Sequence, residues 1–161
     1  MASIKQRIDK LRQELQTSNM EALLVTCPEN IRYLSGFTGG RDARLLVEQE
    51  KKYIITDSRY FAQAALECPD WELVKTSTAG AEVLVSLTEG LANLGFESSD
   101  VSYDQFLQMK ASLKPELLPA KGLVEKLRII KDEAELDKLR TAAHIGDEAF
   151  TSVCQVIKAG M

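Results

Sequence analysis

The single histidine and the cysteines are the side chains best suited to metal or nucleophilic chemistry in this sequence. His144 lies within one helical turn of Asp147 and Glu148, but one imidazole and two carboxylates on a single turn are too few well-directed ligands for a tight metal site. Cys27 and Cys68 each precede a proline, and neither stands in the sequence context of a known nucleophile family. We therefore expect packing cysteines, a partly solvated histidine, no catalytic residue and no metal ligand in this chain.

A glycine-rich loop at residues 36–40 reads GFTGG and is followed by Arg41 and Arg44. The backbone amides of such a loop could hold an anion, with an arginine assisting. However, no Lys-Ser/Thr pair follows the loop, and the next predicted element is a strand rather than a helix whose dipole would favour an anion. A plain turn into the next strand is therefore the expected structure.

Two groups of acidic residues could be mistaken for paired catalytic carboxylates. Asp57 ends a predicted strand and is followed by Ser-Arg-Tyr, which favours an N-cap aspartate with a salt bridge to Arg59. Asp132, Glu133 and Glu135 stand at a predicted helix start, where a capping box and the helix dipole both favour carboxylates. Both groups are therefore interpreted as structural.

The hydrophobic pattern predicts helices that alternate with strands over the first 120 residues. Helices are expected at 3–17, 28–36, 57–67, 83–91 and 102–114, and strands at 22–26, 45–47, 53–56, 71–75, 95–97 and 116–120. The second and third strands form a hairpin, and the last strand contains a proline and is placed at an edge. The predicted fold is α/β, a mixed β-sheet of about five or six strands flanked by helices, plus a C-terminal long helix.

The composition changes at residue 121, and a long helix is predicted from Asp132 to about Lys158. Its apolar residues step by three and four and form a narrow seam: Leu136, Leu139, Ala143, Gly146, Phe150, Val153 and Ile157. Such a seam is suited to lying on a partner surface.

The bulk properties exclude several classes of function. A chain of 161 residues with a net charge of −4 fits one ordinary domain with a core, and it has no basic patch for nucleic acid. No apolar run is long enough to span a membrane. Three distant cysteines do not suggest a disulfide framework, so a reducing cytoplasm is the expected location.

Two segments carry a resemblance to a known enzyme family. The order NIRYLSGFTG, a hairpin and then TDSRY resembles the amino-terminal domain of the Xaa-Pro peptidase, prolidase and creatinase family. The segment LRIIKDEAELDKLRTAAHIGDEAF resembles the linker and first helix of the catalytic "pita-bread" domain of that family. The resemblance implies a creatinase/prolidase-type domain at 1–126 and, at 127–161, the beginning of a catalytic domain that is cut before its metal-binding residues.

The resemblance implies a non-catalytic part of a cytoplasmic metallopeptidase that removes a residue before proline or cleaves Xaa-Pro dipeptides. The full-length enzyme would bind two divalent metal ions (Mn, Co or Zn), and this fragment alone is expected to be inactive. The domain would shape the substrate cleft and a homodimer. In relatives, the loop that enters the hairpin reaches the active site of the neighbouring subunit, which implies Arg41, or alternatively Arg44, as a contact to a proline-containing peptide.

Two other functions remain open for a chain of this kind. Some relatives lose the metals and serve as peptide- or protein-binding modules, and creatinase-type amidinohydrolases cleave a non-peptide C–N bond. The next couple of hundred residues of a longer protein would separate these functions, because two aspartates, one histidine and two glutamates in family order indicate a peptidase.

Overall fold

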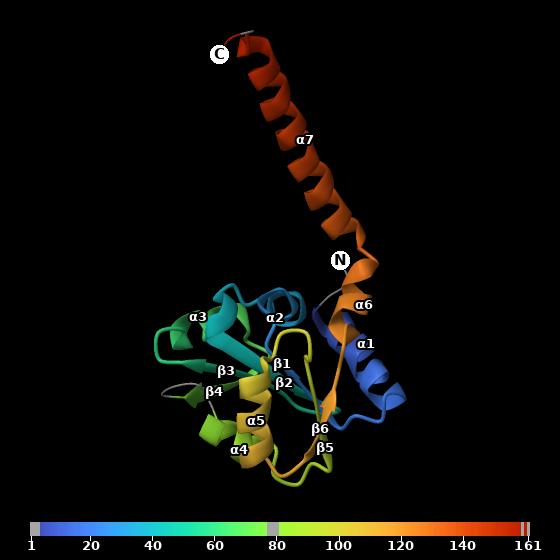
Figure 1. The fold of residues 1–161 in the computed structure, drawn as a ribbon, viewed down its shortest axis with the longest axis vertical. Helices are drawn as coiled ribbons and strands as arrows, with labels where there is room; N and C mark the ends of the chain where they lie inside the picture. Colours follow the sequence, from blue (N-terminus) through green and yellow to red (C-terminus); the bar gives the residue numbers. More distant parts are fainter. Residues whose placement is uncertain (1–3, 77–80, 159, 161) are drawn as a thin grey trace. The chain divides into compact units, whose positions relative to one another are not determined.

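A six-stranded mixed sheet is the centre of the first part of the chain (Figure 1). The computed structural model describes residues 4–76, 81–158 and 160, and the chain divides into two compact units between Arg128 and Ile129. The strands are β1 (Ala22–Val25), β2 (Ala43–Glu48), β3 (Lys52–Asp57), β4 (Glu72–Thr76), β5 (Asn93–Phe96) and β6 (Glu116–Pro119). Their order is β4-β3-β2-β1-β5-β6, which confirms the predicted fold class and the edge position of the last strand.

The two hairpin strands give the sheet its mixed character. β2 pairs antiparallel with both β1 and β3, and every other neighbouring pair is parallel. The helices of this unit are α1 (Ile4–Thr17), α2 (Pro28–Ser35), α3 (Phe61–Glu67), α4 (Ala81–Leu87), α5 (Tyr103–Ser112) and α6 (Leu123–Ile129), with a short 3₁₀ helix η1 (Gly40–Asp42). Among the described residues, no helix is long and apolar enough to cross a membrane.

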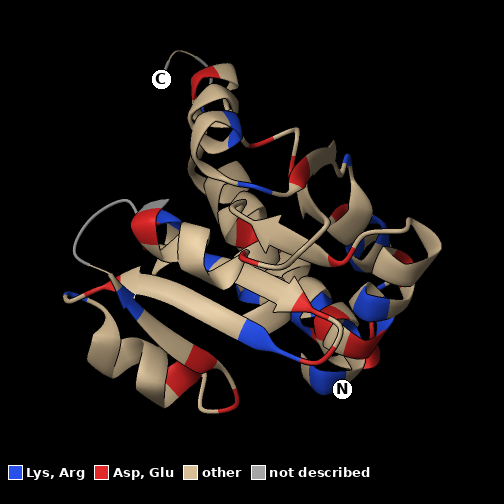
Figure 2. Cartoon of the chain, turned by 90° about the horizontal axis from the view of Figure 1, so that it is seen from below, with Lys and Arg blue, Asp and Glu red and all other residues tan. Residues whose placement is uncertain are grey.

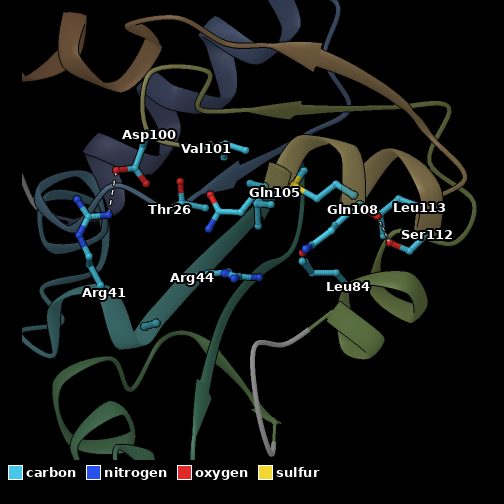
Figure 3. A pocket seen from close by; sticks show the side chains of 13 residues that line it. Thr26, Arg41, Arg44, Leu84, Asp100, Val101, Gln105, Gln108, Ser112 and Leu113 are labelled. Atoms are coloured by element: carbon cyan, nitrogen blue, oxygen red, sulfur yellow. Dashed lines mark hydrogen bonds and ion pairs between the residues drawn. The ribbon is translucent and has the colours of Figure 1, made fainter. Parts of the chain in front are cut away.

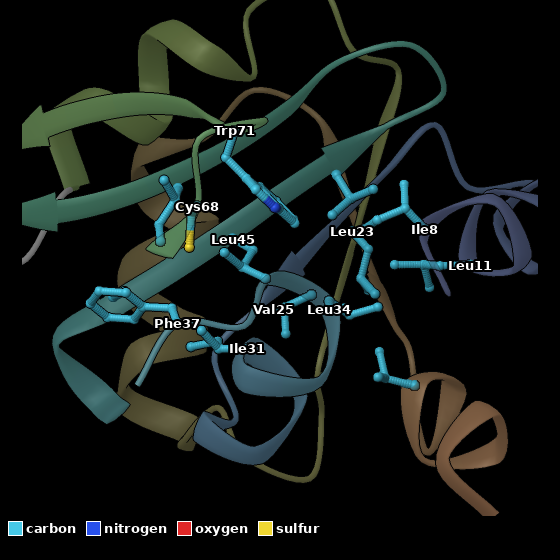
Figure 4. Close-up of a cluster of buried hydrophobic side chains, with 14 of the residues drawn as sticks. Ile8, Leu11, Leu23, Val25, Ile31, Leu34, Phe37, Leu45, Cys68 and Trp71 are labelled. Carbon is cyan, nitrogen blue, oxygen red and sulfur yellow. The ribbon is translucent and has the colours of Figure 1, made fainter. Parts of the chain in front are cut away.

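Strand alternation divides the hydrophobic core between the two faces of the sheet. On one face, Leu23 and Leu45 pack with buried side chains of α1, α2, α3 and α6 (Figure 4). On the other face, Leu24 and Leu46 pack with Leu84 of α4, and partly buried side chains of α5 complete this smaller cluster. Successive residues of β2 therefore point to opposite layers, which decides where Arg44 lies.

The local sequence signals predicted several helix ends correctly. Gly36 ends α2 with a left-handed φ of 83°, and its N–H donates to the carbonyl of Arg32. The predicted capping boxes of Ser102 with Gln105 and of Asp132 with Glu135 are both present. The expected capping box of Ser3 with Gln6 cannot be assessed, because Ser3 lies outside the described residues.

Two details of the predicted elements were wrong, and one helix was not predicted. Asp57 is the last residue of β3, paired with Thr76, and α3 begins only at Phe61. Leu91 follows the end of α4, after Gly90 with a φ of 97°. Helix α6 occupies a segment for which no element was predicted, because its seven residues are too short for a clear periodic pattern.

The second unit consists mainly of α7 (Glu133–Val156), which confirms the long C-terminal helix. Taken by itself, α7 has no buried side chain, and its seam residues Leu139, Phe150 and Val153 are 54%, 72% and 49% exposed. Packing of this seam on a partner surface stays a prediction.

Candidate functional site

Arg41 is displayed at the surface on η1, directly after the glycine-rich loop. Its guanidinium Nη1 lies 3.1 Å from Oδ1 of Asp100, and the Arg41 side chain is 73% exposed. An ion pair of this exposure contributes at most about 1 kcal/mol of stability. Arg41 is therefore held in place only weakly, and most of its donors face solvent.

The segment that carries Arg41 is fixed by the side chain of Asp42. The carboxylate of Asp42 accepts hydrogen bonds from Nη2 of Arg59 at 2.7 Å and from the hydroxyl of Tyr60 at 2.9 Å. Arg59 also binds the carboxylate of Asp57 at 2.7 Å, and these hydrogen bonds lower the pKa of Asp57. The hydrogen bond to Asp42 raises the pKa of Tyr60. The expected Asp57–Arg59 contact is thus present, but it braces a loop instead of capping a helix.

Several polar groups of the glycine-rich loop already have partners within the domain. The N–H of Phe37 donates to Oγ of Ser35, and the N–H and hydroxyl of Thr38 both donate to the carboxylate of Glu67. These bonds, with the Thr38 hydroxyl first, lower the pKa of Glu67. At Gly39 a Cβ atom would lie 2.4 Å from the ring of Phe37, so this glycine allows close packing. The loop is therefore a braced turn, as expected.

A cavity of about 220 Å³ lies between the sheet and helices α4 and α5 (Figure 3). Its polar lining consists of Thr26, Arg41, Arg44, Asp100, Gln105, Gln108 and Ser112. Arg44 reaches into this space from β2, and burial lowers the pKa of its guanidinium. Arg41 and Asp100 also line the cavity. The two arginines that follow the loop therefore both line it, Arg41 near the surface and Arg44 from β2.

Glu97 is a buried carboxylate that directly follows β5. It accepts hydrogen bonds from the backbone N–H groups of Thr26 and Cys27, both at 2.7 Å, and from Nδ2 of Asn30 at 2.6 Å. Asn30 also donates to Glu125 at 2.8 Å, and its Oδ1 accepts from Arg128 at 2.8 Å. Burial raises the pKa of Glu97. This network joins the end of β1, the start of α2 and helix α6.

Neither cysteine of the first unit has the surroundings of a nucleophile. Burial raises the pKa of both Cys27 and Cys68, which disfavours the thiolate. In the second unit, Nε2 of His144 lies 3.3 Å from Glu148. Within the described ranges, no group of three or more His, Cys, Asp or Glu side chains could hold a metal ion. The described residues therefore hold no candidate for the two-metal site, whose ligands the resemblance assigns to a later part of the catalytic domain.

Comparison with known proteins decides the family. The sequence profile of the Creatinase/Prolidase N-terminal domain matches residues 7–130. The chain belongs to this family. Its fold superposes on the Xaa-Pro dipeptidase from Bacillus anthracis with a TM-score of 0.94 and 30% identity, over 99% of this chain and 45% of that one.

Two further relatives show what share of a longer relative this creatinase/prolidase-type chain covers. It is 31% identical to the uncharacterized peptidase YqhT of Bacillus subtilis over 158 residues, which are 96% of this chain and 44% of that protein. The N-terminal domain of the cytoplasmic peptidase PepQ from Mycobacterium tuberculosis has a TM-score of 0.70 and 35% identity, over 75% of this chain and 97% of that one. This chain thus spans less than half the length of the curated relatives it matches. The predicted division at residue 126 stays a prediction.

Acidic and basic residues are mixed along the described elements. Figure 2 shows Lys and Arg interspersed with Asp and Glu along the ribbon. The expectations of a peptide substrate, a homodimer and no nucleic acid or membrane partner remain predictions.

Proposed function

We propose that this chain is the non-catalytic N-terminal part of a cytoplasmic Xaa-Pro metallopeptidase. The full enzyme removes an N-terminal residue before proline or cleaves Xaa-Pro dipeptides. The observation that carries the proposal is the fold match over 99% of this chain to a protein named an Xaa-Pro dipeptidase, of which this chain covers 45%. A dedicated site suits such substrates, because proline lacks the amide N–H that general peptidases bind.

The side chains of this chain support a non-catalytic role. The described residues offer no metal-binding cluster, and burial keeps the thiols of Cys27 and Cys68 protonated. Residues beyond this chain would therefore hold the two divalent ions and perform hydrolysis. The domain described above would close one side of the substrate cleft and take part in a dimer.

Arg41 is the side chain that we assign to substrate recognition across the dimer. It is exposed, it stands on a segment braced by Asp42, and its single ion pair to Asp100 leaves most of its donors free for another acceptor. A guanidinium binds a peptide carboxylate through two parallel hydrogen bonds. Arg44 is less suited to this role, because its side chain is partly buried beneath the cavity instead of projecting from the surface.

The exposed seam of α7 gives a testable form of the dimer proposal. In the isolated chain we expect two copies of α7 to pack antiparallel about a two-fold axis, because a contiguous apolar strip rarely stays bare. Phe150→Lys would place a charge in this seam and weaken the dimer by at least about tenfold. Sedimentation velocity over a concentration series measures this. Ile145→Lys is the matched control, since Ile145 is 60% exposed but does not belong to the seam. A monomeric wild-type chain at high concentration would refute the expectation.

Metal-dependent hydrolysis tests the proposed function. A longer protein that contains this chain and about two hundred following residues should cleave Xaa-Pro peptides with Mn²⁺ or Co²⁺ and lose this activity on chelation. This chain alone should show no turnover under the same conditions. Turnover by the isolated chain would refute its non-catalytic role. A longer protein that binds peptides without cleaving them would indicate a binding module, and one that cleaves creatine would indicate an amidinohydrolase.

A further inference from the structure

The guanidinium of Arg44 lies in the cavity and has no partner among the described residues. Arg44 lies on β2 opposite Ile55, so its side chain shares the sheet face of Leu46 and enters the space beneath α5. Among the residues that the structure describes, no hydrogen bond or ion pair satisfies this guanidinium, and burial alone shifts its pKa. A partly desolvated cation without a counter-ion costs stability, so its presence calls for an anionic ligand.

The rest of the polar lining also supplies hydrogen-bond donors. Oε1 of Gln105 already accepts from the N–H of Ser102, which leaves the Nε2 amide of Gln105 as the available donor. Gln108 lines the same space, whereas the hydroxyl of Thr26 already donates to Glu97 at 3.5 Å and that of Ser112 donates to the carbonyl of Gln108. Asp100 is the one carboxylate of the lining, and Arg41 neutralises it at 3.1 Å. One positive charge, that of Arg44, is therefore left over.

The remaining wall of the cavity is apolar. Leu24 comes from β1, Leu84 from α4, and Val101, Met109 and Leu113 come from α5 and its flanks. Figure 3 shows Arg44 between the helix that carries Gln105 and Gln108 and the segment that carries Leu84. A volume of about 220 Å³ admits a ligand of a few carbon atoms with a polar head, but no macromolecule.

We propose that this cavity binds a small organic monocarboxylate, with its carboxylate on Arg44 and its apolar body against Leu84 and Met109. The guanidinium would form two parallel charge-assisted hydrogen bonds, and the amide of Gln105 a third. The site is distinct from the role assigned to Arg41, and it does not rest on the proposed peptidase function. Two sources share this chemistry, namely the carboxyl end of a peptide and a short fatty acid.

Binding is tested by NMR titration of the isotope-labelled chain with 4-methylpentanoate, with N-acetyl-leucine as the peptide-like probe. At least one of the two should bind saturably with a Kd on the order of 0.1–1 mM and shift the amide signals of residues around Arg44 and α5. The probe that binds more tightly identifies the source. The neutral 4-methylpentanamide, which has the same shape, should bind at least about tenfold more weakly.

Arg44→Met should weaken binding of the carboxylate by about ten- to a hundredfold, whereas Arg44→Lys should retain part of it. Arg32→Met is the matched control, because it removes an equal charge from an exposed site on α2, which packs on the other face of the sheet. The unliganded Arg44→Met chain should melt at the same or a higher temperature than wild type, which excludes unfolding as the cause. Equal binding of acid and amide, equal binding by Arg44→Met, or no saturable binding of either acid would overturn the proposal.

Discussion

Replacing the buried Glu97 by leucine is expected to lower the free energy of unfolding of this chain by about 3–5 kcal/mol. The substitution leaves the N–H groups of Thr26 and Cys27 and the amide of Asn30 without their acceptor. All three donors belong to the junction between β1 and α2, where little water can replace the lost carboxylate. Urea denaturation at pH 7 measures the loss, with Glu82→Leu on the exposed side of α4 as the control. A loss below about 1 kcal/mol would show that the network does not stabilise the fold.

The pH dependence of stability gives a second test of the role of Glu97. Burial raises the pKa of Glu97 above its usual value of 4.5, although its hydrogen bonds to Cys27, Asn30 and Thr26 act in the opposite direction. Because the folded chain then holds this proton more tightly than the unfolded chain, the part of the stability that comes from proton binding by Glu97 is complete below about pH 4.5. It is lost as the pH rises through the raised folded pKa. The stability of wild type relative to Glu97→Gln should therefore fall with rising pH in that window, and a rising difference would contradict this assignment.

The strands and most helices could be predicted because their signals are local. Residues 22–25 form a continuous apolar run, and β1 is indeed buried on both faces in the middle of the sheet. The pairs Ser102 with Gln105 and Asp132 with Glu135 fix helix starts within four residues of sequence. Where donor and acceptor are neighbours in the sequence, the sequence pattern alone was sufficient to predict the helix start.

The candidate site is formed by contacts between residues that are far apart in the sequence, and spacing patterns do not reveal such contacts. Asp57 resembles a helix cap, but pairing with Thr76 keeps its backbone extended and delays the helix until Phe61. Glu97 was expected only as the end of a short strand, while its donors lie about 70 residues away along the chain. The alternation of β2 could have placed Arg44 on the face of Leu46. It could not have shown that α5 leaves a cavity above Arg44.

In the longer protein, Arg41→Ala is expected to lower kcat/KM for an Xaa-Pro substrate by about one to two orders of magnitude. The substitution removes a charge-assisted contact to the substrate worth about 1.5–3 kcal/mol. The fold should remain intact, because the pair of Arg41 with Asp100 is largely exposed and the segment is held by Asp42. Arg41→Lys should recover part of the loss, since lysine keeps the charge but not the two-pronged geometry.

The most direct test of the central claim, that this domain recognises substrate without performing the chemistry, is steady-state kinetics of the Arg41→Ala enzyme. The metal-loaded longer protein would be compared with wild type and with Arg32→Ala, which removes an exposed arginine of α2 away from the cavity. We expect kcat/KM to fall about ten- to a hundredfold for Arg41→Ala alone, with metal content and melting temperature unchanged. Kinetics of Arg41→Ala that match those of wild type would contradict the account and leave Arg41 as a solvated loop charge.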